Sequence, residues 1–259
     1  MEIVQKKVIS VINRKGGVGK TSSTVNLAAA FSLKGRKSLI IDTDKQGNAT
    51  QYVGMYDENM ASMYNVFKGE CYLKDIIRNT NFTGLHVAPA TGEMENLKNS
   101  KLDGYVNIIS SQVSTLDYDY IFIDCPPDLN AIVDNCLTAS TNVIVPIKID
   151  NWSLLGFGCL MQHIQTIRTE YNPNLDFTGA FITMDKPRTQ VSKQVKIQLH
   201  ENLQDNLLKT CIRDNATLIT STFYEKPVVI FDKNCSSAKD YFTLSDELFK
   251  KLLNENGGK

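Results

Sequence analysis

The sequence lacks an excess of charge of either sign, because 28 Lys and Arg residues are matched by 28 Asp and Glu residues. This balance excludes a strongly basic protein that coats nucleic acid, although it permits a local basic patch. A membrane span needs about 20 mostly apolar residues. The longest uncharged run, Asn151 to Ile167, is shorter and holds Asn, Ser, Gln and His side chains. The N-terminal residues also lack the apolar segment and small-residue cleavage site of a signal peptide.

Paired cysteines and grouped histidines are missing as well. The chain has six cysteines without any C-x-x-C pair: Cys71, Cys125, Cys136, Cys159, Cys211 and Cys235. Such scattered cysteines indicate free thiols in a reducing compartment, so we expect a cytoplasmic protein. The histidines show no evident cluster, and each is expected to be structural or on the surface: His86, His163 and His200.

What the chain does have is the composition of an ordinary globular protein, with 42% hydrophobic and 22% charged residues among 259. A chain of this length buries about three quarters of its unfolded surface and needs no metal or disulfide for stability. Composition marks no linker, and neither an internal repeat nor a low-complexity segment is visible. We therefore expect one domain over residues 1–259, without an N-terminal helix-turn-helix extension.

Short apolar runs alternate along the chain with segments of helical period. The runs expected to form strands are Val8 to Ile12, Ser38 to Asp42, Leu85 to Pro89, Tyr120 to Asp124, Asn142 to Ile147 and Phe177 to Met184. The segments expected to form helices are Thr21 to Lys34 (capped by Gly35), Val106 to Leu116, Ala131 to Ala139, Leu154 to Glu170 and Gln190 to Leu208. The irregular stretch from Gln46 to Asn81 is expected to hold short helices over the ligand side of the sheet. Because the strand runs lack polar alternation, we predict an α/β fold: a doubly wound, mostly parallel β-sheet with helices on both faces.

A glycine-rich loop follows the first expected strand and precedes the first expected helix. It reads N-R-K-G-G-V-G-K-T, from Asn13 to Thr21, and this order of strand, loop and helix cradles nucleotide phosphates. The glycines let backbone N–H groups point inward, and the helix start adds the positive end of its dipole. Lys20 is expected to neutralise the β- and γ-phosphates, Thr21 to ligate Mg²⁺ and Ser22 to bond the α-phosphate. The residues predicted to bind the nucleotide are Gly16, Gly17, Val18, Gly19, Lys20, Thr21 and Ser22. The alternative is a glycine-rich turn that binds no ligand.

Three aspartates stand at the ends of two expected strands. Asp42 and Asp44, in I-I-D-T-D-K-Q-G-N-A-T, are two residues apart and point to one side of the strand end beside the phosphate loop. One carboxylate can hold a Mg²⁺-bound water while the other orients the attacking water, and such positioning is most of what phosphoryl transfer needs. Asp124 ends the apolar run Y-I-F-I-D, a pattern that places a carboxylate near Mg²⁺. An Asx turn that caps the strand is the alternative for Asp42 and Asp44.

The loop carries a second lysine, Lys15, ahead of its glycines, and K-G-G-V-G-K-T with both lysines resembles the deviant P-loop of the ParA/MinD family of ATPases. The resemblance implies that Lys15 reaches across a nucleotide-sandwich homodimer and contacts the partner's ATP. The segment after the second strand resembles the family's D-x-D-P-Q-G-N-A-T, which implies that Asp44 orients the attacking water and that Asp42 supports the metal shell. The chain departs at Lys45, where the family usually has proline, and we expect a less rigid turn there.

The resemblance extends over nearly the whole chain. The segments Val145 to Gly156, Ile182 to Val195 and Ile212 to Leu248 are each similar to a family segment. Without an additional N-terminal segment, the chain resembles the short, self-contained class of ParA-type partition ATPases. This resemblance implies Mg²⁺-dependent ATP hydrolysis and an ATP-bound homodimer that binds DNA non-specifically on the nucleoid. It also implies a DNA-bound partner protein of the ParB type that stimulates hydrolysis, and a role in segregating plasmids or chromosomes.

A neutral chain that binds DNA must gather its cations on one face. One group surrounds the start of an expected helix: Lys186, Arg188, Lys193 and Lys196. A second group consists of Arg213, Lys233 and Lys239. Arg188 matches a family arginine implicated in DNA binding, whereas Arg213 is displaced by one position, because the family's I-P-R-N reads I-R-D-N here. A solvated surface of mixed charge is the alternative.

Other proteins share this type of phosphate loop. A membrane-surface ATPase of the MinD type would need a C-terminal amphipathic helix, and the tail has four residues on a helical period: Leu248, Phe249, Leu252 and Leu253. We expect these residues to form the core face of the last helix. A P-loop enzyme acting on a small molecule would need its own polar substrate pocket, which the sequence does not reveal. An iron–sulfur ATPase of the nitrogenase iron-protein type would need cluster cysteines at the dimer seam, where only Cys125 and Cys136 come near.

Overall fold

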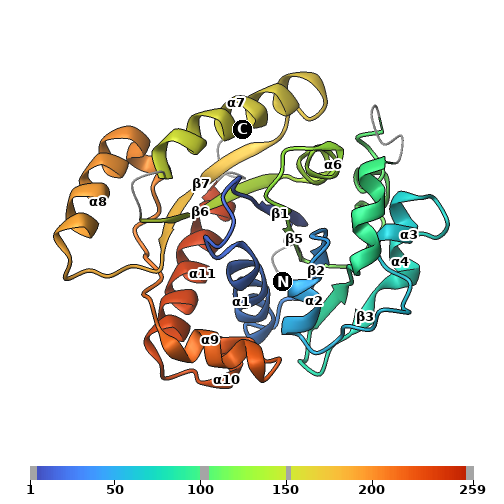
Figure 1. Ribbon diagram of the computed structural model, residues 1–259, viewed down its shortest axis with the longest axis horizontal. Coiled ribbons are helices and arrows are strands. Elements are labelled where there is room, and N and C mark those ends of the chain that lie inside the picture. The colour runs from blue at the N-terminus through green and yellow to red at the C-terminus, as the bar shows by residue number, and fades with distance from the viewer. Residues whose placement is uncertain (1–4, 100–104, 150–152, 255–259) are drawn as a thin grey trace.

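The computed structural model describes residues 5–99, 105–149 and 153–254 of the chain. Within these residues, seven strands form one sheet in the order β3-β4-β2-β5-β1-β6-β7 (Figure 1). Neighbouring strands are parallel except for β3 and β4, which are antiparallel. The strands are β1 Lys7–Val11, β2 Ser38–Asp42, β3 Arg78–Asn79, β4 Leu85–Ala88, β5 Tyr120–Asp124, β6 Asn142–Lys148 and β7 Asp176–Thr183. The prediction of a mostly parallel, doubly wound α/β sheet is confirmed.

The central strands are buried along their whole length. Every residue of β1, β2 and β5 is buried, so these strands need helices on both faces of the sheet. The predicted bounds of β2 and β5 agree with the structure, those of β4 and β6 differ by one residue at one end, and those of β1 and β7 differ by one residue at both ends. The apolar pattern does not predict β3, because its two residues are exposed or half-buried at the sheet edge and carry no periodic signal.

One face of the sheet is covered by helices from the start and the end of the chain. These are α1 Lys20–Leu33, α2 Asn48–Tyr52, α9 Ala216–Phe223, α10 Val228–Phe231 and α11 Ser236–Asn254 (Figure 1). Phe31 of α1 packs on the sheet, with its ring centroid 4.4 Å from that of Tyr120 and 5.5 Å from that of Phe122. Gly35 follows α1 in the left-handed region, at φ 77°, as expected for a glycine that ends a helix.

The opposite face is covered by the middle of the chain. The helices there are α3 Met63–Phe67, α4 Leu73–Ile76, α5 Ser110–Val113, α6 Ala131–Ala139, α7 Ser153–Glu170 and α8 Gln190–Leu203, with the 3₁₀ segments η1 Gly92–Asn99 and η2 Gln204–Asn206. The irregular stretch from Gln46 to Asn81 does hold short helices, of which α2 lies on the first face and α3 and α4 on this one. The sheet therefore separates two apolar cores.

Two predicted helices are too long. The helix predicted from Val106 to Leu116 is reduced to α5, because Asn135 of α6 accepts the N–H of Ile108 and donates to the carbonyl of Tyr105, which holds this segment outside the helix. The helix predicted to reach Leu208 ends at Leu203, because Gln204 adopts a positive φ of 47° and Leu208 then bonds to β7 instead.

Three of the four residues predicted for the core face of the last helix pack as predicted, and the prediction is wrong for Leu253. Leu248 and Leu252 of α11 are buried in the core, Phe249 packs against it and Leu253 is 38% exposed. Residues 255–259, and residues 150–152 of the family-like segment from Val145 to Gly156, lie outside the described residues. Among the residues that the structure describes, no helix is long and apolar enough to span a membrane.

At Gly179, β7 approaches the chain that follows α8 closely. Its φ is 150°, and a Cβ atom there would lie 2.6 Å from the carbonyl oxygen of Asn206. We expect Gly179→Ala to lower the free energy of unfolding in urea by about 1–3 kcal/mol, because a backbone contact must move. Gly92→Ala is the control: nothing lies within 4 Å of its added Cβ. Equal unfolding free energies for the two variants would contradict this account.

Candidate functional site

The loop between β1 and α1 is curled by two left-handed glycines. Gly17 has a φ of 68° and Gly19 a φ of 86°, which L side chains rarely adopt. Val18 between them is buried, and its carbonyl accepts a hydrogen bond of 2.8 Å from the Thr183 hydroxyl at the end of β7. The loop is therefore tied to a distant strand. A curled backbone of this kind presents N–H groups to an anion at the start of α1.

Lys20, which follows the loop, bonds back to the residue at its start. It is 7% exposed, and its Nζ donates to the carbonyl oxygen of Lys15 at 3.1 Å, across the glycines. Burial lowers the pKa of Lys20, and the carboxylates of Asp124 and Asp44 oppose that shift. A buried ammonium at the start of α1, beside a glycine-rich loop, is suited to bind the terminal phosphates of a nucleotide.

Asp124 lies at the end of β5, beside the start of α1. Its Oδ2 accepts a hydrogen bond of 2.7 Å from the Thr21 hydroxyl, and its Oδ1 accepts one of 3.3 Å from the Thr24 hydroxyl. The side chain is fully buried, and burial together with the charge of Asp42 raises the pKa of Asp124 well above its usual range. The structure thus brings together two of the predicted metal ligands, Thr21 and Asp124.

Asp42 pairs in register with Asp124 on the neighbouring strand and is also fully buried. Its Oδ2 accepts hydrogen bonds from the backbone N–H (2.8 Å) and the hydroxyl (2.7 Å) of Thr50, and its Oδ1 accepts the N–H of Asp44 at 3.2 Å. Burial raises the pKa of Asp42 to about 6, although these hydrogen bonds oppose the shift. Asp42 therefore organises the loop that carries Asp44 as well as facing Asp124.

Asp44 lies in a tight turn after β2. Its Oδ1 accepts the N–H of Gln46 at 3.0 Å, and its carbonyl accepts the N–H of Gly47 at 2.9 Å, so the Asx turn that was the alternative for this residue is present. A Cβ at Gly47 would lie 2.9 Å from the carbonyl oxygen of Ala90. Lys45, which stands where the family usually has proline, forms an ion pair of 2.7 Å with Glu95. The ion pair thus ties the turn to η1, at a position where a proline would instead restrict the backbone of the turn.

These oxygen atoms fit a magnesium ion. Mg²⁺ prefers carboxylate and hydroxyl oxygens, and it usually shares its coordination with water and substrate phosphates. Two buried carboxylates side by side repel each other, and a divalent cation would offset that repulsion. Both carboxylates accept hydrogen bonds on both oxygens, but those of Asp124 come from Thr21 and Thr24 of α1, directly after the phosphate loop, which favours Asp124 and Thr21 as the residues that face the ion. Among the described residues, no group of three His, Cys, Asp or Glu side chains forms a metal cage by itself.

Three threonines take part in the site without having been predicted. Thr24 and Thr50 donate to the buried carboxylates, and Thr43 donates to the carbonyl oxygen of Asp124 from its hydroxyl (2.7 Å) and from its N–H (3.1 Å). The sequence did indicate Thr50, because it is the last residue of the family-like segment G-N-A-T. Thr24 and Thr43 had none, because their partner Asp124 lies on another strand.

The cations predicted to bind DNA near α8 lie at its start. Lys186, Arg188 and Lys193 are exposed, and the Nζ of Lys186 is 3.3 Å from the Asp214 carboxylate. Lys196 is different: its side chain is 31% exposed and its Nζ is 2.6 Å from Asp185, which is buried. The mixed-charge alternative therefore describes part of this surface.

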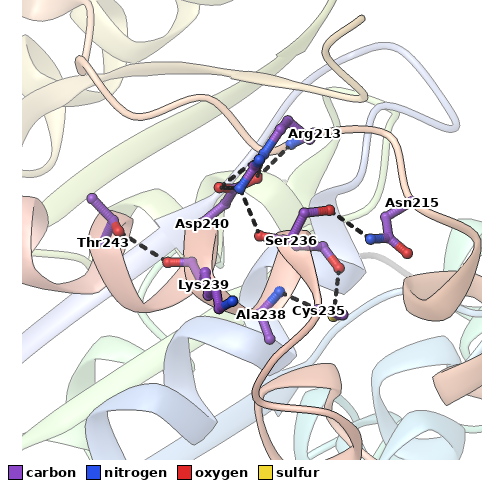
Figure 2. Close-up of polar contacts among 9 residues, drawn as sticks. Arg213, Asn215, Cys235, Ser236, Ala238, Lys239, Asp240 and Thr243 are labelled. Atoms are coloured by element: carbon purple, nitrogen blue, oxygen red, sulfur yellow. Dashed lines mark hydrogen bonds and ion pairs between the residues drawn. The ribbon is translucent and has the colours of Figure 1, made fainter.

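Figure 2 shows that Arg213 is engaged with Asp240 of α11. Its Nε is 2.9 Å from Oδ2 and its Nη2 is 2.6 Å from Oδ1 of Asp240, and Nη2 also donates to the Ser236 carbonyl at 3.3 Å. The Arg213 side chain is 45% exposed and that of Asp240 12%. Arg213 thus ties the segment before α9 to α11. The other two cations of this group, Lys233 and Lys239, are exposed.

The fold joins the two groups of cations. Asp185 and Arg213 form an isolated parallel bridge, in which the Asp185 N–H donates to Ile212 and the Asp214 N–H donates to Asp185. The ion pair between Lys186 and Asp214 crosses the same junction. The start of α8 and the segment before α9 therefore belong to one surface beyond the end of β7.

Comparison with known proteins agrees with this geometry. The sequence matches the AAA domain family over residues 6–177. It is 32% identical to the sporulation initiation inhibitor protein Soj of Bacillus subtilis, over 93% of this chain and 98% of Soj. It is 30% identical to the chromosome partitioning protein ParA of Caulobacter vibrioides, over 95% of this chain and 94% of that protein.

A solved structure shares the fold over almost the full length. It is the cobyrinic acid a,c-diamide synthase from Mycobacterium smegmatis, crystallised with an ATP analogue and magnesium. The TM-score is 0.82, with 26% identity over 95% of each chain. Because an AAA domain covers most of the chain and curated relatives match nearly all of it, the chain belongs to the ParA/MinD family of P-loop ATPases.

Proposed function

We propose that this chain is a partition ATPase that uses ATP and Mg²⁺ and, when ATP is bound, forms a homodimer on DNA. The observation that carries the proposal is one site that combines a buried P-loop lysine, Lys20, with the buried carboxylates Asp42 and Asp124 and with Lys15 ahead of the glycines. The likeness to Soj and ParA over nearly the whole chain supports the choice of DNA partition as the process served.

ATP binding is assigned to the loop and the first turn of α1. The backbone N–H groups of Gly16 to Gly19 and the amino end of α1 receive the phosphates, and Lys20 neutralises the terminal ones. Ser22 is assigned to the α-phosphate. Magnesium, held by Thr21 and Asp124, neutralises charge on the phosphates when it is bound.

Hydrolysis is assigned to Asp44, at the edge of the phosphate loop. The turn that carries Asp44 is held by the hydrogen bond from its N–H to the buried Asp42 and by the exposed ion pair between Lys45 and Glu95. A carboxylate fixed in this way can accept a hydrogen bond from water and aim it at the γ-phosphate. Because the phosphate product is of no use by itself, hydrolysis times the dimer state and is expected to be slow without a partner.

Lys15 is assigned to the other subunit's nucleotide. The main chain of Lys15 is part of the loop. The residue comes before the glycines in the sequence, and those glycines are the ones assigned to the phosphates of the chain's own nucleotide. A lysine in this place adds positive charge at a dimer seam, where two triphosphates would otherwise repel each other. The dimer is therefore expected only with ATP.

DNA contact is assigned to the surface beyond β7, with Arg188 and Lys193 as the cations most available for phosphates. The other proposed contacts are Lys186, Arg213, Lys233 and Lys239. A ParB-type protein bound to DNA is proposed as the partner that accelerates hydrolysis. The chain is proposed to act as a single domain over residues 1–259, in the cytoplasm and on the nucleoid.

The rival functions find less support in the packing. The apolar side chains of the last helix that a membrane anchor would need, Leu248 and Leu252, are buried against the sheet. Cys125 and Cys136 are also fully buried, and therefore do not suit a cluster shared at a dimer seam. A small-molecule enzyme is the second candidate, because a synthase shares this fold at 26% identity.

The first prediction concerns Asp44. We expect Asp44→Ala to bind ATP with the parent affinity and to hydrolyse it about 100- to 10,000-fold more slowly, because the attacking water loses its orienting group. The variant should accumulate as a dimer. Phosphate release and size-exclusion chromatography with ATP measure the two effects. Hydrolysis at the parent rate would show that this carboxylate is not the orienting group.

The second prediction concerns the two lysines of the loop. We expect Lys15→Ala to bind ATP but not to dimerise, because only the partner's nucleotide loses a contact. Lys20→Ala is the control, since it should lose nucleotide binding itself. A slowly hydrolysed ATP analogue and size-exclusion chromatography separate the two variants. A Lys15→Ala protein that dimerises like the parent would contradict the trans assignment.

The third prediction concerns DNA, measured by gel shift of a non-specific duplex with ATP, with ADP and without nucleotide. We expect retention only with ATP, and Arg188→Ala should weaken it without changing the unfolding free energy. Arg213→Ala should weaken it and also lower the unfolding free energy by about 1–3 kcal/mol, because Asp240 loses its partner. The partition proposal would be rejected if the DNA were retained equally with and without nucleotide, or if the protein pelleted with liposomes and did not bind DNA.

A further inference from the structure

Asn13, the first residue of the phosphate loop, bridges two parts of the molecule. Its Nδ2 donates to the carbonyl oxygen of Pro146 in β6 at 2.8 Å, and its Oδ1 accepts the backbone N–H of Lys15 at 2.9 Å. Just before it, the N–H of Ile12 still bonds to the carbonyl of Ile144 at 3.2 Å, as strands β1 and β6 pair. The Asn13 amide therefore continues the strand pairing with a side chain, after the main chain has turned into the loop.

The main chain at Lys15 is held on both sides. Asn13 holds its N–H, and the Nζ of Lys20 holds its carbonyl oxygen at 3.1 Å. Since the two peptide planes around the Lys15 Cα are fixed, the direction of its Cα–Cβ bond is fixed as well. The next two residues, Gly16 and Gly17, are exposed, and a Cβ on either would meet nothing within 4 Å. Packing of these glycines therefore cannot supply the restraint.

We propose that Asn13 is a positioning residue for Lys15, which holds the main chain at Lys15 in the conformation from which the lysine contacts a nucleotide bound by a second copy of the chain. This inference rests on the proposed function, in which Lys15 acts across the dimer. When Lys20 turns to the phosphates of its own subunit's nucleotide, it releases the Lys15 carbonyl, and the Asn13 hydrogen bond, which does not involve Lys20, is the one of these two restraints that remains. Asn13 then keeps the start of the loop in register with β6 in the loaded state.

Loss of the Asn13 side chain is expected to weaken dimerisation. Ordering one residue's backbone is unfavourable by an amount that corresponds to about a tenfold change in an equilibrium constant. We therefore expect Asn13→Ala to raise the dimer dissociation constant about tenfold in Mg²⁺ and a slowly hydrolysed ATP analogue. Affinity for ADP, which reports on the subunit's own site, should stay within about twofold, because the residues assigned to that site are untouched.

The experiment compares four variants by analytical ultracentrifugation with the analogue, by ADP titration and by urea unfolding. Asn13→Ser keeps an oxygen that can accept the N–H two residues on, and should dimerise more tightly than Asn13→Ala. Arg14→Ala removes the exposed neighbouring side chain and should match the parent in all three measurements. Lys15→Ala, run in parallel, tests the proposed function itself.

The outcomes separate the two ideas. If Lys15→Ala dimerises like the parent, the trans assignment has failed. If Lys15→Ala does not dimerise but Asn13→Ala dimerises like the parent, the positioning role alone has failed. If Asn13→Ala weakens ADP binding or unfolding stability as much as dimerisation, Asn13 is a general support of the loop and the inference is overturned.

Discussion

The site depends on the burial of two carboxylates side by side. Asp42 and Asp124 end adjacent parallel strands in register, away from water, where mutual repulsion and desolvation both disfavour their charge. The neighbouring groups offset this cost: hydroxyls of Thr21, Thr24 and Thr50 donate to the pair, and the Lys20 ammonium attracts Asp124. Nucleotide phosphates and their magnesium ion would complete the balance of charge. The P-loop, α2 and the ends of β2 and β5 are therefore parts of one electrostatic arrangement.

The sheet order makes this arrangement possible. With β1 between β5 and β6, the loop after β1 reaches Asp124 on one side and Pro146 on the other. The end of β7 adds the hydroxyl of Thr183, which fixes the loop at Val18. A loop rich in glycine would otherwise sample many conformations, and these ties select one of them. The same order brings the proposed DNA surface to the neighbouring end of β7, so the P-loop and that surface both lie at the carboxyl ends of the strands.

Charge on that edge is less available than a count of lysines and arginines indicates. Arg213, Lys186 and Lys196 each lie beside a carboxylate, whereas Arg188 and Lys193 are exposed at the start of α8. Ion pairs of this kind hold α8, the segment before α9 and α11 together, since Arg213 and Asp185 also join these segments through the backbone. In a chain without net charge, such pairing limits which cations can attract DNA.

The sequence by itself determined six of the seven described strands, the longer helices, the phosphate loop and the three aspartates, but neither β3 nor the short helices α9 and α10. These features follow from local rules: apolar runs, helical periods and motifs in which neighbouring residues act together. Tertiary structure alone decided that α5 is short, that Arg213 is paired with Asp240, that Asp42 holds Thr50, and that Asn13 and Thr24 support the site. The physical reason is distance along the chain. Thr24 and Asp124 are 100 residues apart, and Asn13 and Pro146 are 133 apart, so no local pattern records their contact before the sheet assembles.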